Sequence, residues 1–124
     1  MANSKKDHKT IMVADDDEDL AFLLASQLQQ AGYKVHTCMG GKNLVDEVVK
    51  YRPDLLLLDI AMQQVDGSEL CREIKKDLRT KYLKILMMSG NHDVAEHASA
   101  CGADGYIAKP LSLGALKITI SKYL

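Results

Sequence analysis

The sequence alternates five times between a short apolar segment and a segment whose apolar residues recur with helical periodicity. Two of the apolar segments, residues 55–58 and 83–88, are continuous runs rather than alternating patterns, Lys84 aside. Such runs are typical of central strands that are covered on both faces of a sheet. The other three predicted strands are residues 10–14, 34–37 and 105–108. Strands and helices that alternate through short connections predict right-handed crossovers and a parallel sheet, so we expect a doubly wound (βα)5 domain of the α/β class.

Each intervening segment has one apolar face, as an amphipathic helix requires. Gly32 after the first segment and Pro53 after the second are typical stop signals. The fourth segment, residues 94–101, offers the least apolar area, and the fifth runs from about residue 111 to the end. The apolar positions are Leu20, Leu23, Leu24 and Leu28 in the first helix, Leu44, Val45, Val48 and Val49 in the second, Leu70, Ile74 and Leu78 in the third, and Leu116 and Ile120 in the fifth.

The composition indicates one soluble globular domain. The chain has 124 residues, of which 47% are hydrophobic, and a net charge of −1, so no global field attracts it to nucleic acid or to an anionic membrane. We assign residues 9–124 to the domain and residues 1–8 to a disordered tail. Three cysteines without a C-x-x-C pair, and the absence of an apolar run of about 20 residues, predict a cytoplasmic protein without a disulfide framework or a membrane span.

Polar residues follow four of the five predicted strands. In parallel sheets, ligands bind beyond the carboxyl ends of the strands, and the side chains at those ends share one rim. The residues there are Asp15, Asp16 and Asp17 after the first strand, Asp59 after the third, Ser89 after the fourth and Lys109 after the fifth.

The acidic run at residues 15–18 is on its own typical of a helix N-terminus, where free amides and the helix dipole stabilise carboxylates. Asp59 directly follows four leucines and has no such explanation. Carboxylates that converge at one rim repel one another, which raises a pKa or recruits a cation. Mg²⁺ takes few protein carboxylates and completes its shell with water and phosphate oxygens. The sequence therefore predicts a magnesium site at this rim, with Asp17 as the start of the helix.

A lysine and a hydroxyl at the same rim are suitable partners for a phosphoryl group. Lys109 would act as a point charge and Ser89 as a hydrogen-bond donor. Phosphoryl transfer needs mainly positioning and neutralisation of charge. Asp59 is the carboxylate placed to act as the nucleophile, because acids lie on one side of it and the lysine on the other.

These residues together resemble the receiver domain of bacterial two-component response regulators, over nearly the whole chain from about Thr10 to Leu124. Four elements in order carry the resemblance. They are residues 11–16, which end in the acidic pair, residues 58–62 around Asp59 followed by Asp66-Gly67, residues 88–90 around Ser89, and residues 102–110, which contain Lys109 and Pro110.

The resemblance implies that Asp59 accepts a phosphoryl group from the phosphohistidine of a sensor histidine kinase or a phosphotransfer protein. Asp16, Asp59 and the backbone carbonyl of Ala61 would bind Mg²⁺ directly, and Asp15 would act largely through water. Ser89 and Lys109 would hold the phosphoryl oxygens.

The resemblance further implies a flavodoxin-like sheet of order 2-1-3-4-5 and a switch in which Ser89 and Tyr106 respond to phosphorylation. The partners would be the kinase and a downstream protein or output domain, without direct contact to nucleic acid or membrane, and a phosphorylation-dependent homodimer is compatible with it. The domain would be no enzyme in the usual sense, although it assists its own phosphorylation and dephosphorylation. Gln63 replaces the proline usual in this family, and Ala61 and Asn91 occupy positions that tune dephosphorylation.

Two other functional classes stay open from the residues. The first is a receiver-like adaptor or dimerisation module that works without phosphate, against which the complete set of acids, Ser89 and Lys109 argues. The second is a phosphohydrolase with an aspartyl nucleophile. Such enzymes place a second aspartate two residues after the nucleophile, and Ala61 at that position cannot transfer protons.

Overall fold

The computed structural model describes residues 9–62, 65–90, 94–109 and 112–124. Five parallel strands form one sheet in the order β2-β1-β3-β6-β7. Without the two short strands β4 and β5, this is the predicted order 2-1-3-4-5, and the predicted fold is confirmed. The strands are β1 (Thr10–Ala14), β2 (Lys34–Cys38), β3 (Leu55–Asp59), β6 (Lys84–Ser89) and β7 (Gly105–Ala108).

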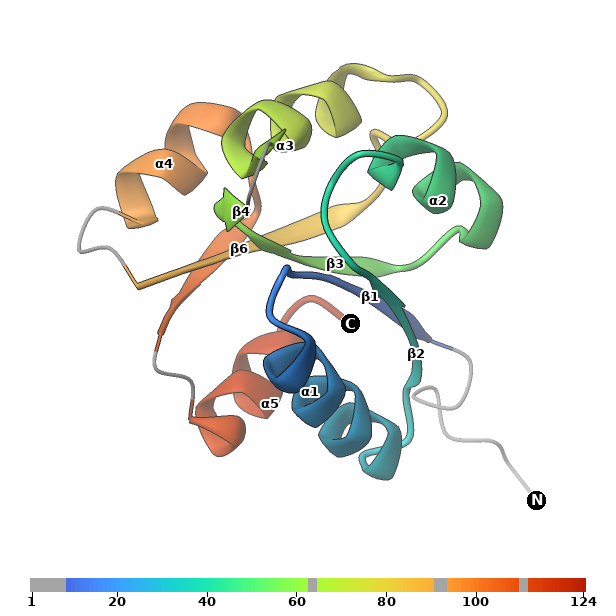
Figure 1. Cartoon of the computed structure of the whole chain (residues 1–124), viewed down its shortest axis with the longest axis vertical. Coiled ribbons are helices and arrows are strands. Elements are labelled where there is room, and N and C mark those ends of the chain that lie inside the picture. The colour runs from blue at the N-terminus through green and yellow to red at the C-terminus, as the bar shows by residue number, and fades with distance from the viewer. Residues whose placement is uncertain (1–8, 63–64, 91–93, 110–111) are drawn as a thin grey trace.

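Helices cover both faces of the sheet (Figure 1). On one face lie α1 (Glu18–Gln30) and α5 (Leu113–Ser121), and on the other α2 (Leu44–Tyr51), α3 (Gly67–Lys76) and α4 (Val94–Cys101). None of the helices in the described residues is both long and apolar enough to cross a bilayer.

The four consecutive leucines of β3 supply both apolar layers. Leu55 and Leu57 pack in the cluster with α1 and α5, whereas Leu56 and Leu58 pack in the cluster with α2, α3 and α4. All four are fully buried, and burying each such side chain contributes about 1.5–3 kcal/mol to stability. Asp59 is the last residue of this buried central strand, which fixes its position.

A short antiparallel hairpin, which the sequence analysis did not predict, connects β3 to α3. It consists of β4 (Ala61–Met62) and β5 (Val65–Asp66). Asp66 then caps α3, because its side chain accepts a hydrogen bond of 2.9 Å from the backbone N–H of Ser68. Asp66-Gly67 is therefore the entry into α3.

Two expected features of the third helix were wrong. The helix ends at Lys76 because the next residue, Asp77, has an extended backbone and pairs through its carboxylate with Arg79. Leu78 consequently lies beyond the helix and is 80% exposed rather than part of the core.

Several predicted boundaries agree with the structure. Gly32 follows α1 with a positive φ, and Pro53 follows the end of α2. Leu23, expected on the buried face of the first helix, is largely exposed. The predicted tail at residues 1–8, the predicted start of the fifth helix at residue 111, and the tuning positions Gln63 and Asn91 lie outside the described residues.

Candidate functional site

The carboxyl edge of the sheet brings together the polar residues that end three of its strands. Asp15 directly follows β1, Asp59 is the last residue of β3, and Ser89 is the last residue of β6. Asp15 is 1% exposed and Asp59 is 6% exposed, and Ser89 is buried as well. Two carboxylates and a hydroxyl are therefore withdrawn from water at this edge.

Lys109 joins the two buried carboxylates. Its Nζ lies 3.2 Å from Oδ2 of Asp15 and 3.5 Å from Oδ2 of Asp59. Its backbone N–H donates a hydrogen bond of 2.8 Å to the carbonyl of Ser89, which fixes the segment after β7 against the end of β6. The predicted convergence of Asp15, Asp59, Ser89 and Lys109 at one rim is what the structure shows.

Backbone amides hold the other oxygen of each carboxylate. The N–H of Asp17 donates to Oδ1 of Asp15 over 2.9 Å, and the N–H of Ala61 donates to Oδ1 of Asp59 over 3.1 Å. Asp17 itself caps α1 by accepting from the N–H of Leu20 over 3.1 Å, as expected. Both buried carboxylates are thus fixed in orientation, with one oxygen directed at Lys109.

Gly67 allows the chain after β5 to pass close to Asp59. A Cβ at this position would lie 2.4 Å from the backbone oxygen of Asp59 and 2.7 Å from Cα of Ile60. Gly67 is not among the described residues with a positive φ, which are Gly32, Gly40, Arg52 and Gly102. Close packing of backbone on backbone is the reason for glycine here.

Burial raises the pKa of Asp59 above its ordinary value, and the neighbouring charge of Asp15 raises it further. Lys109 and the N–H of Ala61 act in the opposite direction but do not outweigh these two effects. One ammonium group beside two buried carboxylates leaves the site with excess negative charge. Such a site gains stability when a cation or a proton joins it.

This raised pKa predicts how stability depends on pH. The unfolded chain loses the proton of Asp59 at a lower pH than the folded chain, so the free energy of unfolding falls as pH rises from the unfolded pKa to the folded pKa. We expect Asp59→Asn to be more stable than the wild type at pH 7, on the order of 1 kcal/mol, with the difference vanishing near pH 4. Urea unfolding at several pH values measures this.

The exposed Asp19 on α1 provides the matched control for that measurement. Asp19 lies in the first turn of the helix, where a carboxylate is favourable. Asp19→Asn should therefore lower stability slightly at pH 7. A loss of stability in Asp59→Asn at neutral pH would contradict the assignment of repulsion to this site.

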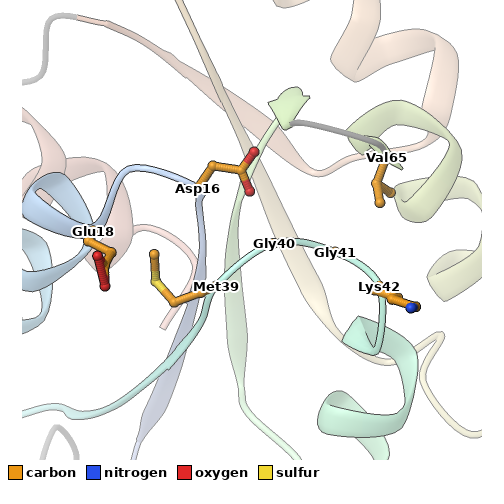
Figure 2. Close-up of a pocket in the computed structure, with 7 residues that line it drawn as sticks. All are labelled: Asp16, Glu18, Met39, Gly40, Gly41, Lys42 and Val65. Atoms are coloured by element: carbon orange, nitrogen blue, oxygen red, sulfur yellow. The ribbon is translucent and has the colours of Figure 1, made fainter.

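Asp16 lies beside this cluster, on the wall of a pocket of about 440 Å³ (Figure 2). The loop between β2 and α2 forms the opposite wall, and a Cβ on Gly40 would lie 3.5 Å from Oδ1 of Asp16. Gly41 is packed against the side chains of Leu70 and Val65. This loop was not predicted to line the site, because the pair Gly40-Gly41 in the sequence indicates only a turn or a loop. The lining residues are Asp16, Glu18, Met39, Gly40, Gly41, Lys42 and Val65.

The donor set suits Mg²⁺ better than a metal that needs a complete protein cage. Within the described part of the chain, no three His, Cys, Asp or Glu side chains form a group that could hold a metal ion. Mg²⁺ retains several waters and binds through one or two carboxylates and phosphate oxygens. Asp15 and Asp59 offer two carboxylates with excess negative charge, and Asp16 stands at the adjoining pocket. These residues fit the ion, and their roles as ligands stay predictions.

The two remaining predicted site residues, Ala61 and Tyr106, are both exposed. Ala61 is exposed at the start of the hairpin, and its N–H rather than its carbonyl contacts Asp59. Tyr106 is half exposed on the edge strand β7, opposite Met87 of β6. It lines a second pocket with residues of α4 and α5, away from the buried carboxylates.

Comparisons with known proteins agree on one family. A sequence model of the response regulator receiver domain matches residues 11–121. The phosphate regulon transcriptional regulatory protein PhoB of Rhizobium meliloti (strain 1021) is 34% identical over 116 residues, which cover 92% of this chain and 51% of PhoB. The chain thus spans about half the length of this curated relative.

Solved structures give the same result. A putative response regulator from Chloroflexus aurantiacus has 30% identity and a TM-score of 0.87, with 93% of this chain and 96% of that chain covered. The response regulator protein TrrA of Thermotoga maritima, solved in complex with Mg²⁺-BeF, has 31% identity and a TM-score of 0.84, with 94% and 99% covered.

Proposed function

Because this chain belongs to the response regulator receiver domain family of two-component signalling, we propose that Asp59 is its phosphoacceptor and that a sensor histidine kinase or a phosphotransfer protein is its donor. The observation that carries the proposal is the pair of buried carboxylates, Asp15 and Asp59, joined by Lys109. Asp59 ends the central strand, and its Oδ2 is the oxygen that faces the lysine.

The proposed step is a transfer of one phosphoryl group. A carboxylate oxygen of Asp59 forms a bond to phosphorus while the bond between phosphorus and the donor nitrogen breaks, and that nitrogen keeps the bonding electron pair. Lys109 neutralises charge on the phosphoryl oxygens as they arrive at the site. Asp59 attacks in its ionised form, which Lys109 favours against the effects of burial and of Asp15.

Asp16, Asp59 and the carbonyl of Ala61 are the groups that would hold Mg²⁺ directly, and Asp15 would act largely through water. When bound, the ion supplies positive charge against the phosphoryl oxygens. Two features of this chain support its presence: the excess negative charge at Asp15 and Asp59, and the likeness to TrrA, which was solved with Mg²⁺-BeF.

Phosphorylation would be transmitted to the surface formed by α4, β7 and α5. Ser89 is buried at the end of β6, and its carbonyl accepts from the N–H of Lys109, directly after β7. Tyr106 on β7 is half exposed. A new dianionic group beside Ser89 and Lys109 would bias these segments towards a second arrangement, which a downstream protein, an output domain or a second copy would recognise.

Intact-mass measurement tests the proposed function. The wild type is incubated with acetyl phosphate in the presence of Mg²⁺ or of EDTA. We expect one phosphoryl adduct with Mg²⁺ and little or none with EDTA. If a folded protein that binds Mg²⁺ gains no adduct, the phosphate-independent adaptor becomes the better reading.

A further inference from the structure

Charged side chains are distributed unevenly between the two edges of the sheet. The carboxyl edge carries the acidic residues 15–19 and Asp59. The opposite edge, where the strands begin, is reached by the end of α2 and by the segment from α3 to β6. Positions 50–52 and 79–84 contain five charged residues, all of them basic, and the acids nearest to them in the sequence are Asp54 and Asp77. The net charge of −1 conceals this separation.

Six residues form what we call the basic edge surface, namely Lys50, Tyr51, Arg52, Leu78, Lys81 and Tyr82. The guanidinium carbon of Arg52 lies 5.3 Å from the ring centroid of Tyr82, which joins the end of α2 to the segment before β6. Leu78 is 80% exposed, Tyr82 43% and Tyr51 40%. Large apolar and aromatic side chains are therefore exposed among cations.

Two of the nearby acids, Asp54 and Asp77, already have partners within the chain. Asp77 pairs with Arg79 over 2.7 Å. Asp54, whose charge acts on Tyr82, accepts a hydrogen bond of 2.9 Å from the N–H of Thr10. Among the residues that the structure describes, no salt bridge neutralises Lys50, Arg52 or Lys81. The surface thus offers cations that can pair with an external anion.

Arg52 occupies a backbone conformation that favours glycine. Its φ is +48°, in the left-handed region, at the end of α2. An L-residue there costs about 1–2 kcal/mol relative to its ordinary conformation. The guanidinium group of Arg52 lies over the ring of Tyr82, and a guanidinium can bind a carboxylate through two parallel N–H donors.

We propose that the basic edge surface binds an acidic segment of a partner protein, in which carboxylates flank an apolar residue. Arginine and tyrosine are the residues that contribute most at protein interfaces, and exposed Leu78 supplies an apolar contact. Single-stranded nucleic acid fits less well, because both rings already have neighbours: Tyr51 stacks on His36 at 3.7 Å between ring centroids, and Tyr82 on Arg52. Bases need free aromatic faces.

Fluorescence anisotropy tests this proposal with a labelled peptide of alternating glutamate and leucine as the probe. We expect binding that weakens with salt and that falls by about tenfold or more in Arg52→Glu, which reverses a charge at the centre of the surface. The matched control is Lys117→Glu, the same kind of charge reversal at an exposed position of α5, which should bind like the wild type. Asp59 lies at the opposite edge of the sheet and takes no part in this binding, so the result does not depend on its phosphorylation.

Arg52→Gly separates loss of binding from loss of folding. Glycine relieves the left-handed backbone and removes the guanidinium, so this variant should unfold at the same or a higher urea concentration and still lose binding. Equal binding by Arg52→Glu, Arg52→Gly and the wild type would overturn the proposal. So would binding of an oligothymidine in preference to the peptide, or equally weak binding of the peptide and its glutamine counterpart.

Discussion

Lys109→Met is expected to slow the phosphorylation of Asp59 by about 10²–10³-fold, the usual cost of removing one fixed charge that stabilises a transition state. Lys109 lies within reach of both buried carboxylates, at 3.2 Å from Asp15 and 3.5 Å from Asp59. Methionine retains most of the length and the apolar stem of the side chain, so the decrease in rate measures the contribution of the ammonium group. The rate of adduct formation with acetyl phosphate and Mg²⁺, followed by intact mass, is the measurement.

The loss of Lys109 should also change the protonation of Asp59. Lys109 is among the groups that lower its pKa against the effect of burial, so the residual rate of the variant should reach its plateau at a higher pH than that of the wild type. The control is Lys84→Met, at the opposite edge of the sheet, where the ammonium is half exposed and 4.0 Å from Asp104. Equal rates for Lys109→Met and the wild type would show that Lys109 does not assist the phosphorylation of Asp59.

Gly67→Ala is expected to destabilise the domain by about 3 kcal/mol or more, beyond the usual cost of an overpacked side chain. The added Cβ would meet backbone atoms, the oxygen of Asp59 at 2.4 Å and Cα of Ile60 at 2.7 Å. Backbone at the end of a central strand cannot rotate away as a side chain can. The intrinsic preference of a helix for alanine, about 1 kcal/mol, does not offset such a contact. Urea unfolding gives the difference directly.

Gly114→Ala is the matched control, because Gly114 is also a glycine within a helix, α5. The nearest atom to a Cβ there is Oγ of Ser112 at 4.0 Å, and no steric cost arises. This variant should be as stable as the wild type or more stable by up to about 1 kcal/mol. Gly67→Ala with wild-type stability would show that the approach of α3 to Asp59 is not fixed.

The sequence predicted those parts of the molecule that depend on continuous apolar patterns. Residues 55–58 and 83–88 are apolar on both faces and became the central strands β3 and β6. Parallel strands place their carboxyl ends at one edge, so the meeting of Asp15, Asp59, Ser89 and Lys109 followed from the order of the strands.

Three other features could not be predicted in this way. The hairpin β4–β5 has two residues per strand, too few to show a period. The apolar spacing of the third helix continues to Leu78 in the sequence. The helix nevertheless ends at Lys76, where Asp77 pairs with Arg79. Gly67 and Gly41 are glycines because other segments approach them closely, and the sequence does not show which segments these are.

The position of the phosphoryl group is the most direct test of the central claim. The wild type, phosphorylated with acetyl phosphate and Mg²⁺, is treated with borohydride, which reduces an acyl phosphate and converts the modified aspartate to homoserine, and its peptides are then sequenced by mass spectrometry. Homoserine is expected at position 59 alone, and no adduct is expected in Asp59→Asn. Homoserine at position 15, 16 or 66, or an undiminished adduct in Asp59→Asn, would contradict the central claim.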